Sequence, residues 1–425
     1  MAEEKKRSES DFQFVQEKIK QQPLWKNRIF RKVVLTAGLA VLFGAVSCVT
    51  FVVLYPKLQQ WLGEEPVQEI SIPRDEEPEA DGQQDQANQE TQDPIVITET
   101  QELELEDYSE LFAKMRSVSK EAMKSMVTVT AGSSDMDWFN EQQISEHQVS
   151  GLLVGDNGVE KLILTNYSDI KGADQLQVTF VDSAVVEATL KKYDPVTDLA
   201  ILSVNLGDLE SSTREKLRMV VWGNSKIVQA GDPIIAIGSP AGISGSVLFG
   251  NLTAVSYDAK AVDGEYQLLL TDLPHADGSG ALINFQGQVV GWLQDSYLYS
   301  DNEETLTAYG ISDLKSIIEH LCNNKDIVYL GIQGVDVPRD LQESEDMPKG
   351  IYVTGVEMDS PAMTAGIQSG DIIVSISGQE ITSLAKMQEL LLNFSEDQVI
   401  SVKVMRKGKD GLKEIGSSVK LGALK

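Results

Sequence analysis

The residues from Val33 to Tyr55 form an uncharged, mainly apolar run of 23 residues. About 20 apolar residues, each rising 1.5 Å in a helix, cross the hydrocarbon core of a membrane. A secretory signal is the alternative, but its apolar centre is only about 7–15 residues long. A signal also ends in a small-x-small cleavage pattern, which does not follow this run. The sequence therefore predicts a transmembrane helix over residues 33–55.

The charges on either side of this run predict its orientation. Arg28, Arg31 and Lys32 precede it, and the far side soon becomes acidic. Basic residues flanking a span stay on the cytoplasmic side. We therefore expect residues 1–32 in the cytoplasm and a single-pass protein that exposes everything after Tyr55 outside the cytoplasm.

A strongly acidic segment follows the predicted span. Residues 64–107 contain sixteen Asp and Glu but only one Arg. Such a segment buries too little apolar surface to offset its chain entropy. We predict an acidic disordered linker over residues 56–107. The whole chain carries a net charge of -29, which argues against binding to nucleic acid.

The remainder has the texture of a β protein. Its 42% apolar residues occur in many short runs, such as residues 162–165, 234–237 and 289–292, separated by Gly, Asp and Asn. This pattern favours antiparallel barrels or sandwiches. Helical spacing occurs in residues 108–124 and 311–321. Ser360 and Pro361 suit the cap and the first position of a short helix. A second, smaller β-rich unit follows from about residue 329 to residue 421.

The cysteine and histidine content limits the chemistry. Cys48 and Cys322 are too few for a disulfide framework or a four-thiolate zinc site. The three histidines are His147, His275 and His320. Neither a phosphate-binding loop nor a cofactor fingerprint occurs in the sequence. We therefore expect neither a metal nor another cofactor.

Five stretches, in this order and spacing, resemble the HtrA/Deg family of trypsin-like serine proteases that carry a C-terminal PDZ domain. They are residues 162–166, 194–202, 230–242, 329–332 and 360–371. The resemblance implies a mainly β protein with two six-stranded antiparallel barrels followed by a PDZ domain. It places the protease-like domain at residues 108–325 and the PDZ domain at residues 326–425.

The resemblance also locates two positions of the catalytic triad. The family carries its histidine two residues after a Thr-Asn pair, and here Thr165-Asn166-Tyr167 leads to Ser168. A serine hydroxyl has too little proton affinity to act as a general base near neutral pH. The aspartate position is retained as Asp198. We interpret Asp198 either as a remnant of the triad or as a turn aspartate satisfied by backbone amides.

The nucleophile position has two alignments. The family motif Gly-Asn-Ser-Gly-Gly-Pro-Leu corresponds to residues 276–282, and an ungapped alignment replaces the serine by Gly278. A one-residue deletion would instead make Ser279 the nucleophile. Such a deletion shortens the turn whose amides form the oxyanion hole, where donor placement is critical. We favour Gly278 and therefore predict two lost triad positions.

The second β-rich unit contains a candidate peptide site. Tyr329, Leu330, Gly331 and Ile332 resemble the loop with which PDZ domains capture a terminal carboxylate through backbone amides. Leu330 and Ile332 would line a pocket for an apolar last side chain. The alternative is a PDZ domain used only for internal packing or assembly.

These observations favour a pseudoprotease at a bacterial cell membrane that binds exposed protein C-termini or partner proteins in extracytoplasmic quality control. An alternative is an active serine endopeptidase that uses Ser279 with an atypical base. A third hypothesis is an assembly or chaperone component, and a homotrimer is one expected form because family members are often trimeric.

Overall fold

The computed structural model describes residues 67–75, 105–136, 142–293, 304–345, 347–409 and 411–423. The predicted cytoplasmic segment, the predicted transmembrane helix and most of the predicted linker lie outside these residues. In the described part of the chain, no helix is long and apolar enough to cross a membrane.

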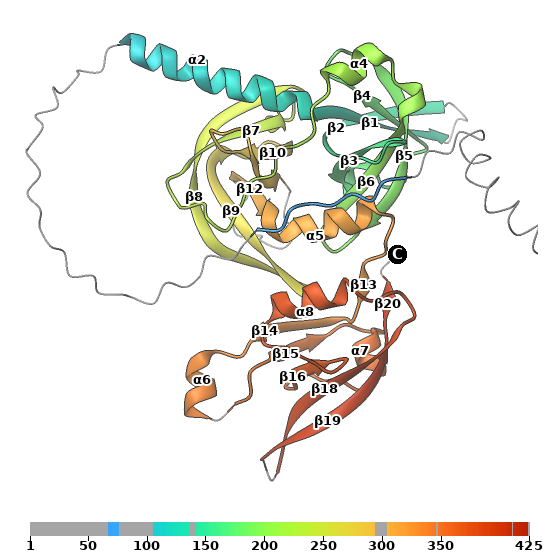
Figure 1. The fold of residues 1–425 in the computed structure, drawn as a ribbon, viewed down its shortest axis with the longest axis vertical. Helices are drawn as coiled ribbons and strands as arrows, with labels where there is room; N and C mark the ends of the chain where they lie inside the picture. The colour runs from blue at the N-terminus through green and yellow to red at the C-terminus, as the bar shows by residue number, and fades with distance from the viewer. Residues whose placement is uncertain are drawn as a thin grey trace, which may run out of the picture. The chain divides into compact units, whose positions relative to one another are not determined.

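The first barrel is built from six antiparallel strands in the order β1-β2-β3-β6-β5-β4 (Figure 1). Alternate side chains of these strands fill its interior, and Val129, Ile163 and Leu202 are fully buried there. The strands are β1 (Met126–Met136), β2 (Gln142–Asp156), β3 (Glu160–Asn166), β4 (Gln175–Thr179), β5 (Val185–Asp194) and β6 (Leu199–Asn205).

The second barrel closes in the order β10-β11-β12-β9-β8-β7. Its strands β8 and β9 form a long hairpin that turns at Val262 and Asp263. The prediction of two six-stranded antiparallel barrels is therefore confirmed. The strands are β7 (Pro233–Ser239), β8 (Ser246–Ala261), β9 (Gly264–Pro274), β10 (Ser279–Ile283), β11 (Val289–Leu293) and β12 (Thr305–Gly310).

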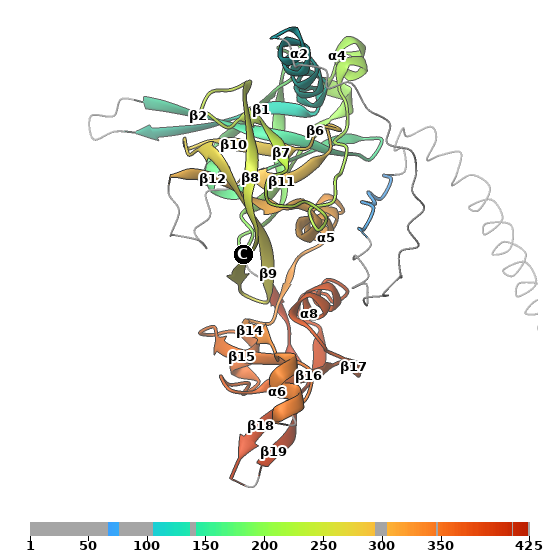
Figure 2. The same cartoon turned by 90° about the vertical axis from the view of Figure 1, so that its left-hand side faces the viewer.

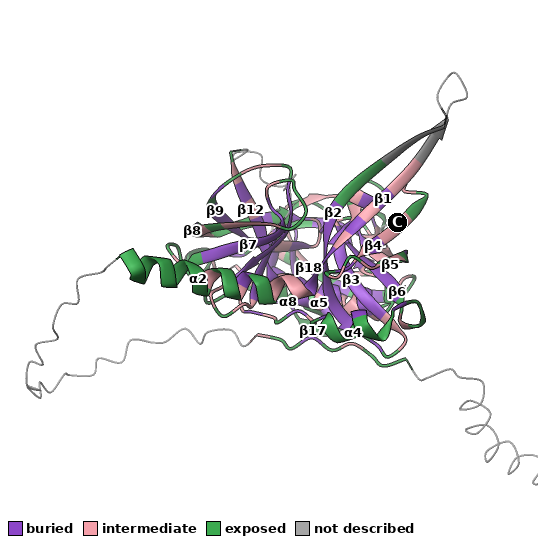
Figure 3. Ribbon diagram, turned by 90° about the horizontal axis from the view of Figure 1, so that it is seen from above, coloured by how far each residue is buried: buried purple, intermediate pink, exposed green. Residues whose placement is uncertain are grey.

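Helices cover the barrels from outside. Helix α2 (Leu105–Ala122) is mostly exposed (Figure 3), whereas α5 (Ile311–Cys322) packs its apolar face into the core that the two barrels share. Cys322 is buried at the end of α5, as its structural interpretation requires. The shorter helices are α3 (Tyr167–Ile170), α4 (Ser211–Lys216) and the 3-10 turns Met123–Ser125 and Leu206–Asp208.

The C-terminal unit (Figure 2) occupies the range predicted for a PDZ domain. It has an apolar core of its own. Its main sheet has the order β14-β15-β16-β18-β19, so β14 (Ile332–Asp336) is an edge strand. Ser360 caps α7 (Pro361–Thr364) by accepting a hydrogen bond from the amide of Met363 at 3.0 Å. The other elements are β13 (Val328–Tyr329), α6 (Arg339–Ser344), β15 (Ile351–Val356), β16 (Ile372–Ile376), β17 (Gln379–Glu380), α8 (Leu384–Leu391), β18 (Val399–Gly408), β19 (Gly411–Lys420) and β20 (Gly422–Ala423).

Residues 67–75 correct the expectation of an uninterrupted free spacer over residues 56–107. This segment runs along α5 (Figure 1), and Ile72 is buried in the shared core. The side chain of Asn323 exchanges two hydrogen bonds with the backbone of Ile70. Asp75 forms an ion pair with Lys315 at 2.7 Å, and Lys315 is only 2% exposed. Two isoleucines and a paired aspartate therefore dock a segment whose composition is otherwise that of a linker.

Candidate functional site

A cleft of roughly 910 Å³ brings together all the triad-equivalent positions predicted from the sequence. Ser168 and Asp198 line it from the first barrel, and Gly278 and Ser279 line it from the second. The cleft is therefore located where two barrels of a trypsin-like protein would hold a substrate. Its chemistry depends on what each of these positions presents.

Ser168 and Asp198 form a closed pair. The Ser168 hydroxyl donates to Asp198 Oδ2 at 2.6 Å, and the Ser168 amide donates to Asp198 Oδ1 at 2.7 Å. The carbonyl of Asp198 accepts the amide of Tyr167 at 2.8 Å. Asp198 thus satisfies the free amides at the start of α3 while it adopts a left-handed backbone with φ of 56°. In this arrangement the Asp198 carboxylate accepts hydrogen bonds from the hydroxyl and the amide of Ser168, at the position where the family resemblance expects an imidazole.

The Ser279 side chain faces the interior between the barrels. The residue is 6% exposed, and its Oγ accepts a hydrogen bond from the amide of Ser150 at 2.7 Å. The second neighbour of this oxygen is the hydroxyl of Ser239 at 3.1 Å. In the described structure the partners of Ser279 Oγ are therefore an amide donor and a hydroxyl.

The backbone at Gly278 leaves no room for a side chain. A Cβ placed on Gly278 would lie 2.4 Å from the carbonyl oxygen of Pro240 and 2.8 Å from that of Ser239. These are backbone atoms, so a rotation of a side chain cannot relieve the overlap. The preceding residue, Asp277, has φ of 21°, which few non-glycine residues adopt. The turn is therefore shaped for glycine at position 278.

Two histidines lie near this cleft. His147 lines it, with Nε2 3.7 Å from Asp169 Oδ1, and the His147 side chain is 65% exposed. His275 Nε2 lies 3.7 Å from the fully exposed Asp277 carboxylate. The sequence pattern did not predict that His147 lines the cleft, because β2 carries it there from a position distant in the sequence. The third histidine, His320, contacts the carbonyls of Ser316 and Leu392 and has a structural role.

Trp292 belongs to the core. It is fully buried, and its indole Nε1 donates to Asn166 Oδ1 at 2.7 Å. The structure places Trp292 among the buried residues shared by the two barrels.

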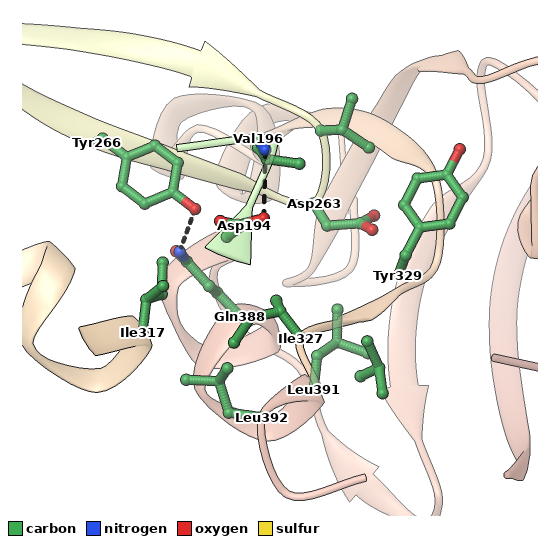
Figure 4. Close-up of a pocket in the computed structure, with 12 residues that line it drawn as sticks. Asp194, Val196, Asp263, Tyr266, Ile317, Ile327, Tyr329, Gln388, Leu391 and Leu392 are labelled. Carbon is green, nitrogen blue, oxygen red and sulfur yellow. Dashed lines mark hydrogen bonds between the residues drawn. The ribbon is translucent and has the colours of Figure 1, made fainter. Parts of the chain in front are cut away.

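The predicted carboxylate loop of the PDZ domain holds a carboxylate from the same chain. The amides of Leu330, Gly331 and Ile332 all donate to the side chain of Asp263, at distances of 2.7 to 2.9 Å. Asp263 is the turn residue between β8 and β9, and Figure 4 shows its side chain extending toward Tyr329. The four predicted loop residues therefore lie together, and three of them present convergent donors.

Burial raises the pKa of Asp263 to about 6, although the three loop amides act in the opposite direction. The negative charge of Glu357 raises this pKa further. The carboxylate in turn raises the pKa of Tyr329 and of the buried Tyr266, after the larger effect of burial on each. At neutral pH the Asp263 side chain is ionised, so its hydrogen bonds to the loop are charge-assisted. Sequence patterns did not reveal this contact, because Val262-Asp263-Gly264 indicates only a hairpin turn.

Comparison with known proteins agrees with this architecture. Residues 149–291 match the trypsin-like peptidase domain, and residues 328–415 match the PDZ domain. Serine protease Do-like HtrB of Bacillus subtilis is 31% identical over 280 residues, which cover 61% of this chain and 60% of that protein. In these regions the chain is similar to serine proteases of the HtrA/Deg type.

Two further comparisons show the same similarity. Serine endoprotease DegS of Haemophilus influenzae is 29% identical over 278 residues, covering 64% of this chain and 76% of that protein. The solved structure of the HtrA-type protease AlgW with a decapeptide has a TM-score of 0.52 and 22% identity, and it covers 73% of this chain and 99% of AlgW. At this identity the structural match supports the fold alone. The alignments span 60% and 66% of two Bacillus subtilis relatives, HtrB and HtrA.

Proposed function

We propose that this chain is a catalytically silent member of the HtrA/Deg family that binds exposed protein C-termini through its PDZ domain. The observation that carries the proposal is the pair of hydrogen bonds from Ser168 to Asp198, at the position where the family resemblance expects histidine. Without an imidazole next to that carboxylate, an attacking hydroxyl has no base in the usual place. The enclosed Ser279 and the glycine-shaped turn at Gly278 support the same conclusion.

The size of the expected loss in turnover favours a protein without detectable hydrolysis over a slow enzyme. Removing one triad member from a serine protease costs about 10⁴- to 10⁶-fold in turnover, and the losses are not additive. Binding does not depend on those groups, because PDZ domains recognise a peptide terminus with backbone amides and a sheet edge. The convergent amides of Leu330, Gly331 and Ile332 supply that chemistry.

The proposed setting is the extracytoplasmic face of a bacterial membrane. The predicted helix over residues 33–55 would anchor the chain, and several relatives are named as probable periplasmic endoproteases. Capture of exposed C-termini there is a step in protein quality control. A homotrimer remains a proposal drawn from the family resemblance.

A peptidase assay on the full chain, with a quenched fluorescent protein substrate, tests the silent site. We expect turnover at the buffer background, unchanged in Ser279→Ala. Turnover that Ser279→Ala or His147→Ala abolishes would instead support the alternative enzyme, with His147 as its base. That variant pair is informative because both residues line the cleft.

Peptide binding is tested separately, on an array of peptides that vary the last residue and end either in a free carboxylate or in an amide. We expect binding that requires the free carboxylate and an apolar last side chain. Equal binding of the amidated peptides would contradict a carboxylate-reading PDZ site.

A further inference from the structure

The tip of the β8–β9 hairpin lies against the parts of the PDZ domain that would receive a peptide. Besides its carboxylate bonds, Asp263 donates its backbone amide to the carbonyl of Ile332 at 2.8 Å. Ile332 is the first residue of the edge strand β14, whose unpaired groups are the ones that strand addition uses. One residue therefore engages both the carboxylate loop and the sheet edge, as the last residue of a bound peptide would.

The other wall of the groove is also occupied. A Cβ on Gly264 would lie 3.0 Å from the side chain of Gln388 on α8, so the hairpin backbone passes directly against that helix. Gln388 Nε2 donates to the hydroxyl of Tyr266 at 2.9 Å, a contact drawn in Figure 4. The hairpin tip is thus held between β14 and α8. The cavity left beside it is only about 40 Å³, too small for a peptide side chain and its backbone.

The turn is suited to this contact. Asp263 has φ of 59°, a conformation that Asp and Asn tolerate better than most residues and that a tight hairpin turn requires. The long strands β8 and β9 carry the turn from the second barrel to the PDZ domain. The contact is therefore built from a defined turn and not from a flexible side chain on an open surface.

We infer that the β8–β9 hairpin is an internal ligand of the PDZ groove, with the Asp263 side chain in place of a peptide's terminal carboxylate. A C-terminal peptide then binds only after it displaces the hairpin, and its binding separates the second barrel's turn from the PDZ domain. This inference rests on the proposed peptide-binding function, which it deepens by making the groove self-occupied. If the hairpin leaves the groove free in about 1–10% of the molecules, the apparent affinity for a peptide falls in proportion to that fraction. The docked hairpin therefore weakens peptide binding by roughly 10- to 100-fold.

Two variants of the full chain remove the internal carboxylate. Asp263→Gly eliminates it and tolerates the positive φ, and Asp263→Asn keeps the turn and the shape of the side chain but removes the charge. Asp258→Asn is the matched control, because Asp258 is an exposed residue of the same hairpin, on β8. Circular dichroism of each variant verifies that the barrels remain folded.

Hydrogen exchange measures occupation without any peptide. We expect the amides of residues 330–332 to exchange at least about tenfold faster in Asp263→Gly than in the parent and in Asp258→Asn, because their acceptor is lost. Unchanged exchange in both Asp263 variants would overturn the inference, whatever peptides do.

The peptide array described above then measures competition. We expect Asp263→Gly, which removes the side chain altogether, to bind free-carboxylate peptides roughly 10- to 100-fold tighter than the parent and Asp258→Asn do. Equal affinity in parent and variants would overturn the inference while leaving peptide binding intact. Faster exchange at residues 330–332 with no peptide bound by any protein would support the internal ligand and contradict the proposed function.

Discussion

Under the proposal of a silent site, introducing histidine at position 168 and serine at position 278 is expected to produce no active protease. In the double variant Ser168→His with Gly278→Ser, the introduced imidazole has room because Ser168 is exposed beside Asp198. The introduced hydroxymethyl group does not, because a Cβ on Gly278 would lie 2.4 Å from the Pro240 oxygen. Non-bonded carbon and oxygen atoms need more than about 3 Å, so the turn must move by more than about half an ångström.

That displacement is large on the scale of catalysis. A misplacement of about 1 Å costs on the order of 10²-fold in rate, and the oxyanion donors belong to the same turn. The double variant therefore has all three side chains of a triad without their geometry. We expect its kcat/KM on a fluorescent peptide to remain within about tenfold of the parent.

Gly278→Ala is the matched control, because it introduces the same Cβ without a hydroxyl. Both substitutions at Gly278 should lower the free energy of unfolding by about 1–3 kcal/mol, as overpacking does. Thermal denaturation measures this. A gain of about 10³-fold in kcat/KM that requires both Ser168→His and Gly278→Ser would refute the conclusion that the turn is shaped for glycine.

Three further outcomes follow from contacts in the described structure. Asp75→Ala should lower the free energy of unfolding by about 3–5 kcal/mol, because the buried Lys315 loses its ion-pair partner. Chemical denaturation of the double variant Asp75→Ala with Lys315→Met should show that most of this stability is recovered. Arg406→Ala should destabilise the PDZ domain by about 2 kcal/mol or more, because Asp371 is 1% exposed and loses two charge-assisted hydrogen bonds. A denaturation midpoint equal to that of the parent would contradict this expectation. Asp263 has a pKa of about 6 in the docked hairpin and an ordinary pKa when released, so the docked state gains stability progressively as the pH falls from about 6 to about 4. Peptide affinity, measured by fluorescence anisotropy, should therefore fall from pH 7 to pH 5 more in the parent than in Asp263→Gly, and equal pH profiles would contradict the assignment.

The barrels and the PDZ domain were predictable because their signals are local. Short β-branched runs with turn residues between them specified strands such as β3 and β7, and Ser360 with Pro361 specified the start of α7. The spacing from Thr165 to Ser168 likewise located the position that faces Asp198. These features depend on neighbours within a few residues.

The orientation of groups in the cleft was less accessible to sequence analysis. Whether Ser279 faces a substrate or the interior depends on the register of β10 against β7, which pairs Ser279 with Ser239. With the same register, a Cβ on Gly278 would overlap the backbone of Pro240. A one-residue difference in alignment reverses both conclusions, so motif comparison alone left two nucleophile positions open.

Long-range contacts were not predicted at all. Asp263 is 67 residues from Leu330, and Asp75 is 240 residues from Lys315. Composition assigned Asp75 to a spacer, and no sequence pattern singled out Asp263. In each case a carboxylate finds its partner only after distant elements pack. Such partners carry no periodicity that a sequence pattern could detect.

The proposed silent site requires that no serine in the cleft is activated, and labelling with a fluorophosphonate examines this requirement without any substrate. Mass spectrometry of the intact full chain after prolonged incubation should show no added mass, as for Ser279→Ala. Stoichiometric modification that maps to Ser279 and disappears in Ser279→Ala would demonstrate an activated nucleophile and contradict the proposal.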